Sequence, residues 1–211
     1  MDIKQKQTII DATYELMKEE KISELKVSEI AEAANCSVED VYDNFGDLEH
    51  LYYLASIKIL DAYTHQSQDA IGEISDPMEL EMTLWENFLP YVFKYIDVFE
   101  LIFWNTRRSK VQEAIKEYYD LYPESKTGIE FTEMYFSTSL KERNTTVLKL
   151  AAKEGYIKEE DVPVLVSLNT GLLYNMMASY KNIFRTDTIP KAVSDKYLAV
   201  LKSLYDHYRL K

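Results

Sequence analysis

The stretch Ile30–Phe45, IAEAANCSVEDVYDNF, contains two short helical patterns on either side of a tight turn. A helix is predicted over Val27–Ala34, because its apolar residues share one face: Val27, Ile30, Ala31 and Ala34. Asn35-Cys36 is suited to the turn, since Asn tolerates a left-handed backbone better than most residues. Ser37 then begins a second helix, whose apolar side consists of Val38, Val41, Tyr42 and Phe45.

The start of this second helix has a specific signature. Ser37 is a good N-cap, and Asp40 three residues later completes a capping box, in which the two side chains satisfy each other's free backbone amides. Cys36 and Val41 are placed to form a hydrophobic staple. A longer helix over residues 4–20 precedes them, and its apolar face holds Ile9, Thr13, Leu16 and Met17. Two short helices around a tight turn, packed on a longer one, make a helix-turn-helix unit.

The charge of this unit conflicts with its shape. A helix-turn-helix normally grips a polyanion, yet no Lys or Arg lies between Lys26 and Lys58. The same interval contains seven acids: Glu29, Glu32, Glu39, Asp40, Asp43, Asp47 and Glu49. Residues 1–55 hold five bases and thirteen acids, a formal charge of −8 within a chain total of −12. Since basic side chains supply most non-specific affinity for DNA, we expect repulsion to oppose DNA binding here.

Residues 5–55 resemble the amino-terminal DNA-binding domain of the TetR family of transcriptional regulators. The matching residues are Ile10, Ala12, Val27, Ile30, Ala31, Ala34, Ser37, Val41, Tyr42, Phe45, Glu49 and Leu51. The chain departs from the family pattern at five places. Asn35-Cys36 replaces the usual Gly-Val, and Glu39-Asp40 replaces Gly-Thr. Asp43 stands where a phosphate-contacting residue is common, Leu48 where a Lys begins the fourth helix, and Lys26 where a Thr often caps the second.

The resemblance implies that this unit contacts DNA. The candidate DNA-binding residues are Lys26, Ser28, Ser37, Val38, Glu39, Asp40, Tyr42, Asp43 and Asn44. Asn44 could read adenine in the major groove, and Glu39 or Asp43 could accept a hydrogen bond from cytosine. Backbone amides at the helix start would still reach phosphate. Glu39 and Asp40 also have a simpler explanation, because acids are favoured in the first turn of any helix.

The rest of the chain is also predicted to be helical. Gly and Pro together number only ten among 211 residues, and apolar residues recur at helical spacing nearly throughout. Further helices are predicted over residues 48–69, 77–95, 97–105, 109–121, 128–153, 161–184 and 190–209. Pro90 should kink or end its helix, and Gly155 should cap the one before it. The expected fold is all-α, with an N-terminal three-helix helix-turn-helix domain (1–50) and a larger C-terminal helical domain for ligand binding and dimerisation (51–211).

The C-terminal domain is rich in aromatic residues, most densely over residues 85–104. By the resemblance it encloses a pocket for an effector, and small-molecule pockets are mostly apolar with a few polar groups. The candidate pocket residues are Trp85, Phe88, Phe103, Trp104, Phe131, Tyr135, Tyr174 and Met177. Polar residues that could orient a ligand are Asn87, Asn105, Arg107, Arg108 and Asn175. Plain core packing is the alternative for each aromatic residue.

Two apolar stripes near the C-terminus are similar to the helices that form a four-helix dimer interface in this family. The candidate interface residues are Leu165, Leu168, Leu172, Met176, Tyr197, Leu201, Leu204 and Tyr205, and Gly171 would allow a close helix approach. Both stripes could instead face their own core. A two-fold dimer would place two recognition helices about one DNA turn apart or a little more.

The sequence shows none of the motifs that an enzyme active site usually requires. His50, His65 and His207 have no His or Cys partner at metal-binding spacing, and Cys36 has no nearby His. No glycine-rich phosphate loop or nucleophile elbow occurs, so we expect no catalytic site, metal or cofactor. One Cys, no apolar run of 18 residues and no leader pattern indicate a cytoplasmic protein that does not span a membrane.

The sequence therefore predicts a TetR-like, ligand-responsive transcriptional regulator that binds operator DNA as a homodimer. Its expected effector is a small apolar or aromatic molecule. The alternative is a TetR-like protein that has lost direct DNA binding and acts as a co-regulator, through protein contacts of the acidic helix-turn-helix face.

Overall fold

The computed structural model describes residues 2–71, 74–104, 106–126, 137–182 and 188–211, which are helical with no strand among them. The first six helices are α1 (Ile3–Glu19), α2 (Val27–Ala33), α3 (Val38–Phe45), α4 (Leu48–Ile71), α5 (Pro77–Lys94) and α6 (Ile96–Phe103). After them come α7 (Arg108–Leu121), η1 (Pro123–Lys126), α9 (Leu140–Lys153), η2 (Glu159–Asp161), α10 (Val162–Tyr180) and α11 (Thr188–Tyr208). The all-α expectation is confirmed.

The chain forms two compact units, and each contains residues from separate parts of the sequence. Unit 1 consists of residues 1–62 and 97–128, and unit 2 of residues 63–96 and 129–211. The division at residue 50 expected from the sequence stays a prediction. Within unit 1, side chains of α7 bond to α4. The hydroxyls of Tyr118 and Tyr119 both donate to the carboxylate of Asp61 at 3.1 Å.

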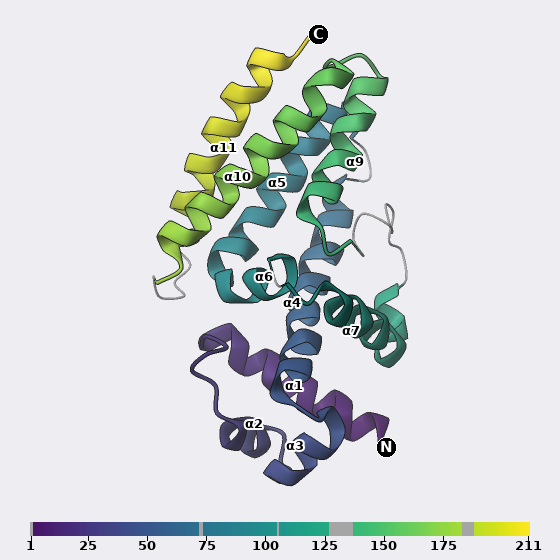
Figure 1. Cartoon of the computed structure of the whole chain (residues 1–211), viewed down its shortest axis with the longest axis vertical. Helices are drawn as coiled ribbons and strands as arrows, with labels where there is room; N and C mark the ends of the chain where they lie inside the picture. The colour runs from purple at the N-terminus through teal and green to yellow at the C-terminus, as the bar shows by residue number, and fades with distance from the viewer. Residues whose placement is uncertain (1, 72–73, 105, 127–136, 183–187) are drawn as a thin grey trace. The chain divides into compact units, whose positions relative to one another are not determined.

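Within unit 1, α1, α2 and α3 form the predicted helix-turn-helix (Figure 1). Asn35 has φ 51°, in the left-handed region predicted for the turn. The amide of Cys36 donates to the carbonyl of Ala31 at 2.9 Å, which closes the end of α2 as glycine usually does in a C-terminal cap. Apolar residues from all three helices fill the core beneath the turn: Ile9, Ile10, Met17, Ile30 and Val41.

Within unit 2, α5, α9, α10 and α11 run side by side (Figure 1). The carboxylate of Asp76 accepts from the amides of Met78 and Glu79 and so caps α5, with Pro77 in the first turn. α5 continues through Pro90, so this proline does not end the helix. Gly155 has φ 79° and follows the end of α9, as predicted for its cap. Of the helix predicted over 128–153, residues 128–136 lie outside the described part.

Candidate functional site

The start of α3 is held by its own side chains. The carboxylate of Asp40 accepts from the backbone amide of Ser37 at 2.8 Å and from its hydroxyl at 2.7 Å. The amide of Asp40 donates in return to the Ser37 hydroxyl at 3.0 Å. These bonds to Ser37 hold the pKa of Asp40 below its usual value. The predicted capping box is therefore confirmed, and both side chains serve the helix before they could serve a ligand.

The side chain of Asn44, the candidate for adenine recognition, also forms hydrogen bonds within the protein. Its side-chain nitrogen donates to the carbonyl of Asp40 at 2.8 Å, one turn earlier, and to the side-chain oxygen of Gln5 at 3.4 Å. Reading adenine takes the donor and the acceptor of the amide at once. Asn44 would have to give up at least one of these bonds to do so.

The solvent-facing side of α3 presents Val38, Glu39, Tyr42 and Asp43, and Tyr42 is 44% exposed. Glu39 and Asp43 have no ionic partner among the described residues. Lys26 and Ser28, at the start of α2, are exposed as well. The ammonium of Lys26 lies 3.0 Å from the carboxylate of Glu29, which raises the pKa of Lys26. The nearest basic side chain of the motif is therefore already paired.

Other charged side chains of the first sixty residues pair with residues far away in the sequence. The carboxylate of Glu49 pairs with Arg107 and, at 3.5 Å, with Lys110. Lys6, which is 3% exposed, lies 2.5 Å from Glu117, and His50 lies 2.7 Å from the same carboxyl. The hydrogen bond to His50 and the bond and charge of Lys6 lower the pKa of Glu117 to about 2. Glu39 and Asp43, on the outer face of α3, have no such partner among the described residues.

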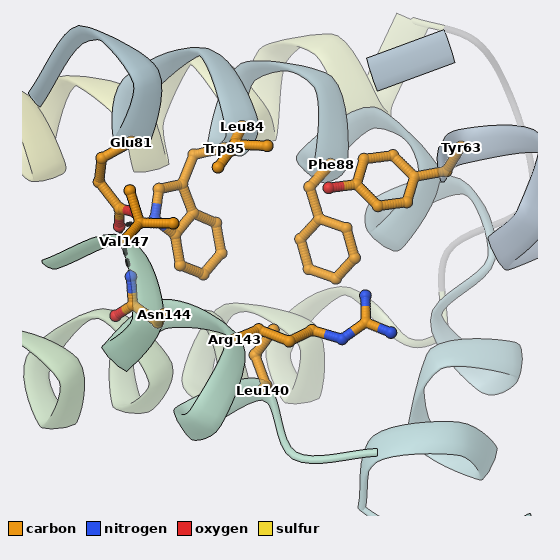
Figure 2. A pocket seen from close by; sticks show the side chains of 9 residues that line it. All are labelled: Tyr63, Glu81, Leu84, Trp85, Phe88, Leu140, Arg143, Asn144 and Val147. Atoms are coloured by element: carbon orange, nitrogen blue, oxygen red, sulfur yellow. Dashed lines mark hydrogen bonds between the residues drawn. The ribbon is translucent and has the colours of Figure 1, made fainter. Parts of the chain in front are cut away.

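A second candidate site lies inside unit 2, between α5 and α9 (Figure 2). Figure 2 shows aromatic and aliphatic side chains facing Arg143 and Asn144, with Glu81 at one end. The lining residues are Tyr63, Glu81, Leu84, Trp85, Phe88, Leu140, Arg143, Asn144 and Val147. The cavity measures about 40 Å³. Typical small-molecule pockets measure roughly 300–1,000 Å³, so a large effector would have to displace lining side chains.

Two of the predicted pocket residues, Trp85 and Phe88, line this cavity. Phe103 and Trp104 belong to unit 1 and are not among its lining residues. Phe131 and Tyr135 lie outside the described residues. On α10, Met177 is buried and Tyr174 is exposed, and neither lines the cavity. The aromatic cluster predicted from the sequence is therefore divided between two units.

The polar residues that were predicted to orient a ligand lie in several different environments. Arg107 pairs with Glu49, Arg108 and Asn175 are exposed, and Asn105 lies outside the described residues. The side-chain nitrogen of Asn87 is buried and has no hydrogen-bond partner in the described part of the chain. The polar groups that do line the pocket are Glu81, Arg143 and Asn144, which the sequence patterns did not single out.

Glu81 is the centre of a buried polar network. Trp85 Nε1 donates to its Oε1 at 2.7 Å, the Tyr205 hydroxyl donates to the same oxygen at 2.6 Å, and Asn144 Nδ2 donates there too. Glu81 is only 2% exposed, and this burial raises its pKa to about 7 against the effect of the three donors. A carboxyl group that titrates near neutral pH, in a cavity, is a typical feature of a functional site.

The network continues from the pocket into α10 and α11. Asn169 Nδ2 donates to Asn144 Oδ1 at 3.1 Å and to the Tyr205 hydroxyl at 2.6 Å. The Tyr197 hydroxyl donates to the backbone carbonyl of Asn169 at 3.0 Å. A continuous hydrogen-bond network that includes Glu81 therefore connects four helices of unit 2: α5, α9, α10 and α11.

Comparison with known proteins identifies the architecture. No protein-family model matches the chain, and no curated protein matches it. Solved structures do match. The TetR-family regulator PfmR of Thermus thermophilus is 19% identical, with a TM-score of 0.52 over 90% of this chain and 97% of its own. The regulator FadR of Bacillus subtilis, in complex with stearoyl-CoA, is 18% identical, with a TM-score of 0.59 over 92% and 96%. This chain has the TetR-family fold.

A third solved structure also matches the chain over most of its length. The ketosteroid transcriptional regulator KstR2 of Mycobacterium tuberculosis is 14% identical, with a TM-score of 0.57 over 98% of this chain and 95% of its own. In all three matches nearly the whole of both chains is covered. The TetR fold therefore extends over both units, beyond the helix-turn-helix where the sequence resemblance lies.

The helices expected to form the TetR-type dimer have both buried and exposed apolar residues. Leu165, Tyr197, Leu201 and Tyr205 are buried within the protomer and have almost no surface to offer a partner. Leu168 is 47% exposed, while Leu172, Met176 and Leu204 are partly exposed. Val164 on α10 and Val200 on α11 add exposed apolar surface. Gly171 is exposed in the middle of α10, where an added Cβ would meet nothing within 4 Å.

Metal-binding clusters and membrane-spanning helices do not occur in the described residues. No group of three or more His, Cys, Asp or Glu residues among them could hold a metal ion. No helix that the structure describes is long and apolar enough to cross a membrane. Cys36 is a free, half-buried cysteine, and burial raises the pKa of its thiol.

Proposed function

We propose that this protein is a ligand-responsive transcriptional regulator that binds operator DNA as a homodimer. The observation that supports this most directly is the capped, outward-facing α3 helix in a TetR-fold chain. Val38, Glu39, Tyr42 and Asp43 occupy the face that a recognition helix presents to the major groove. A DNA-binding role would place the protein in the cytoplasm.

The acidic face predicts an unusual mode of DNA recognition. Glu39 and Asp43 are suited to accept from the exocyclic amine of cytosine, and Tyr42 and Val38 offer apolar contact to thymine methyl groups. Few basic residues are near, because Lys26 is paired with Glu29. Binding should therefore depend on base contacts and backbone amides more than on phosphate neutralisation.

The proposed dimer uses the exposed apolar surface of α10 and α11. Leu168, Leu172, Met176 and Leu204 are the predicted interface residues that keep surface available, and Val164 and Val200 extend the patch. A run of exposed aliphatic residues along two neighbouring helices favours association with an identical surface. The lack of a side chain at Gly171 permits a close approach of the partner helix.

The effector site in this proposal is the cavity at Glu81. Its hydrogen bonds lead to α10 and α11, the helices of the proposed interface. A ligand that rearranges this network would shift the balance between dimer arrangements that fit DNA and those that do not. Effector and DNA should then change each other's affinity by the same factor.

The test is a selection of genomic fragments by the purified protein, followed by titration of any enriched fragment across salt concentration. An enriched palindrome with a shallow salt dependence is expected. Glu39→Gln with Asp43→Asn is the matched variant, since it removes the charge and keeps the shape. It should reduce the preference for the enriched fragment while raising affinity for random DNA.

Two results would contradict the proposal. No enrichment at low salt would mean that α3 does not bind DNA, and the acidic face would then be tested for binding to a basic protein partner. A variant that gains specific binding would mean that Glu39 and Asp43 oppose recognition instead of providing it.

A further inference from the structure

Glu81 lines the cavity, and its two carboxylate oxygens are used unequally. Its three hydrogen-bond donors, on Trp85, Asn144 and Tyr205, all bond Oε1. Oε2 receives no hydrogen bond from any described residue, and no described Lys, Arg or His forms an ion pair with Glu81. A buried carboxylate with neither a cation nor a full set of donors is unfavourable. Oε2 is therefore where a ligand with a donor group gains most.

We propose that the pocket takes a short primary amine in its protonated form, with the ammonium on Glu81 Oε2 and the hydrocarbon part against Trp85 and Phe88. This inference rests on the proposed effector role of the cavity, and it names the chemical class of the effector.

The aromatic walls suit a cation as well as a hydrocarbon. The ring centroids of Trp85 and Phe88 lie 5.9 Å apart in an edge-on arrangement, and the ring centroids of Tyr63 and Phe88 lie 5.0 Å apart. A cation beside the face of Trp or Phe is attracted by the ring, and more strongly when water is excluded. Carboxylate and aromatic groups together favour an ammonium over a neutral hydroxyl of the same size.

Arg143 fixes the orientation of the ligand. Figure 2 shows its guanidinium near Phe88 and Tyr63, away from the Glu81 end of the cavity. Its Nε donates to the backbone carbonyl of Ser137 at 2.9 Å. A positive charge at this end repels a second ammonium, so the pocket should reject diamines. The competing possibility is an anion beside Arg143, which the test below includes.

The size of the cavity restricts the length of the amine. With about 40 Å³ available, only a few heavy atoms fit without movement of the lining side chains. We therefore choose n-butylamine as the probe, with butan-1-ol and butyrate as its neutral and anionic counterparts of nearly the same shape.

The pH dependence of amine binding provides a second test of the proposal. Burial raises the pKa of Glu81 to about 7, whereas the amine stays protonated well above neutral pH, as lysine does. The other groups that face Glu81 are Asn144 on α9, Trp85 on α5, Tyr63 on α4, and Tyr197 and Tyr205 on α11. Arg143 lines the opposite end of the cavity. Burial holds the pKa values of Tyr197 and Tyr205 well above 10. Amine affinity should therefore fall as the pH drops below 7, because Glu81 must give up its proton to bind.

The experiment titrates the full-length protein with each probe and follows the indole N–H resonance of Trp85, which donates to Glu81. Trp104→Phe identifies that signal, since the chain has two tryptophans. At about pH 8, butylamine should bind about tenfold more tightly than butanol, and butyrate least. Glu81→Gln keeps an acceptor for the three donors and should reduce the tenfold preference for butylamine over butanol to about parity.

Equal or tighter binding of butanol or butyrate overturns the amine assignment, and so does an amine affinity that is the same at pH 6 and pH 8. If Glu81→Gln proves unfolded, the pH dependence of the wild-type protein decides alone. The proposed regulator function is judged separately, by DNA binding. Amine binding without release of DNA would retain this inference and remove the effector role. Specific DNA binding by a protein that does not bind butylamine would retain the regulator function and overturn this inference.

Discussion

The two units of this protein hold their buried charges in opposite ways. In unit 1, Lys6 is buried against a carboxylate, Glu117, which also bonds His50. In unit 2, Glu81 is buried among neutral donors, with no cation paired to it in the described structure. A buried charge must be paired or lose its charge. Unit 1 follows the first route, which is suited to a rigid scaffold, and unit 2 follows the second, which leaves a group able to respond to a ligand.

The difference appears in the direction of the pKa shifts. The pKa of Glu117 falls from 4.5 to about 2, so its contribution to stability is present above pH 4.5 and is lost as the pH falls toward 2. The pKa of Glu81 rises from 4.5 to about 7, so its contribution is present below pH 4.5 and is lost as the pH rises through 7. The two carboxyl groups therefore give unit 1 and unit 2 opposite responses to acid.

The largest effect is expected from Glu117→Ala. It leaves the ammonium of Lys6 buried without its carboxylate, which typically costs about 3–4 kcal/mol. Chemical denaturation would measure the loss in the unfolding transition of unit 1. The control is Lys6→Met with Glu117→Leu, which replaces the pair by apolar groups and should recover most of the loss. A loss below about 1 kcal/mol would mean that Lys6 is not confined by burial.

Glu81→Gln should change the pH dependence of unit 2 more than its stability at low pH. Between pH 4.5 and pH 8 the wild-type protein should lose up to about 3 kcal/mol relative to the variant, because only the wild type must ionise a buried carboxyl. Denaturation of both proteins across this pH range gives the difference. Parallel curves for the two proteins would contradict the contrast between the units.

Removal of the α3 cap should have a moderate effect. Ser37→Ala removes the acceptor for the amide of Asp40 and should destabilise unit 1 by about 1 kcal/mol. Ser37→Thr, which keeps the hydroxyl, is the matched control and should lose much less. Hydrogen exchange at the α3 amides would show whether the helix start frays, and unchanged protection would argue against the capping role.

The smallest effect is expected from Arg107→Gln. Its partner Glu49 lies on the surface, where ion pairs contribute less than about 0.5 kcal/mol and are screened by salt. Thermal unfolding at low and high salt would test this. A loss as large as that of Glu117→Ala would mean that charge pairing in unit 1 matters regardless of burial, and the proposed contrast would need revision.

The parts of the structure that were predictable depend on neighbours close in sequence. The Asn35 turn and the Ser37–Asp40 box each involve residues within a few positions of one another, and both are confirmed. The pairing of Lys6 with Glu117 joins residues 111 positions apart, which no local pattern contains. Local signals therefore identified the helix-turn-helix but not the partners that balance its charge.

The pocket shows a different limit. Aromatic density located Trp85 and Phe88, but it gives no weight to a carboxylate and therefore does not indicate Glu81. A signal did exist, because Glu81 precedes Leu84, Trp85 and Phe88 by three, four and seven positions and so shares their apolar face. Asn144 has the same signal, because Leu140 lies four positions before it and Val147 lies three positions after it. Spacing alone does not show that Asn144 and Glu81 meet, since that depends on how α9 packs against α5.

Gly171 lowers the stability of α10 within one protomer, and the proposed dimer offers a reason for it. An alanine there would fit without touching any neighbour, and it would favour the helix by about 1 kcal/mol. Considered alone, the protomer is therefore less stable than a single methyl group could make it, and no described residue around Gly171 accounts for the difference. In the proposed dimer the missing methyl group leaves room for the backbone of the partner helix. The stability that glycine costs the single protomer would then be offset by closer packing between the two chains.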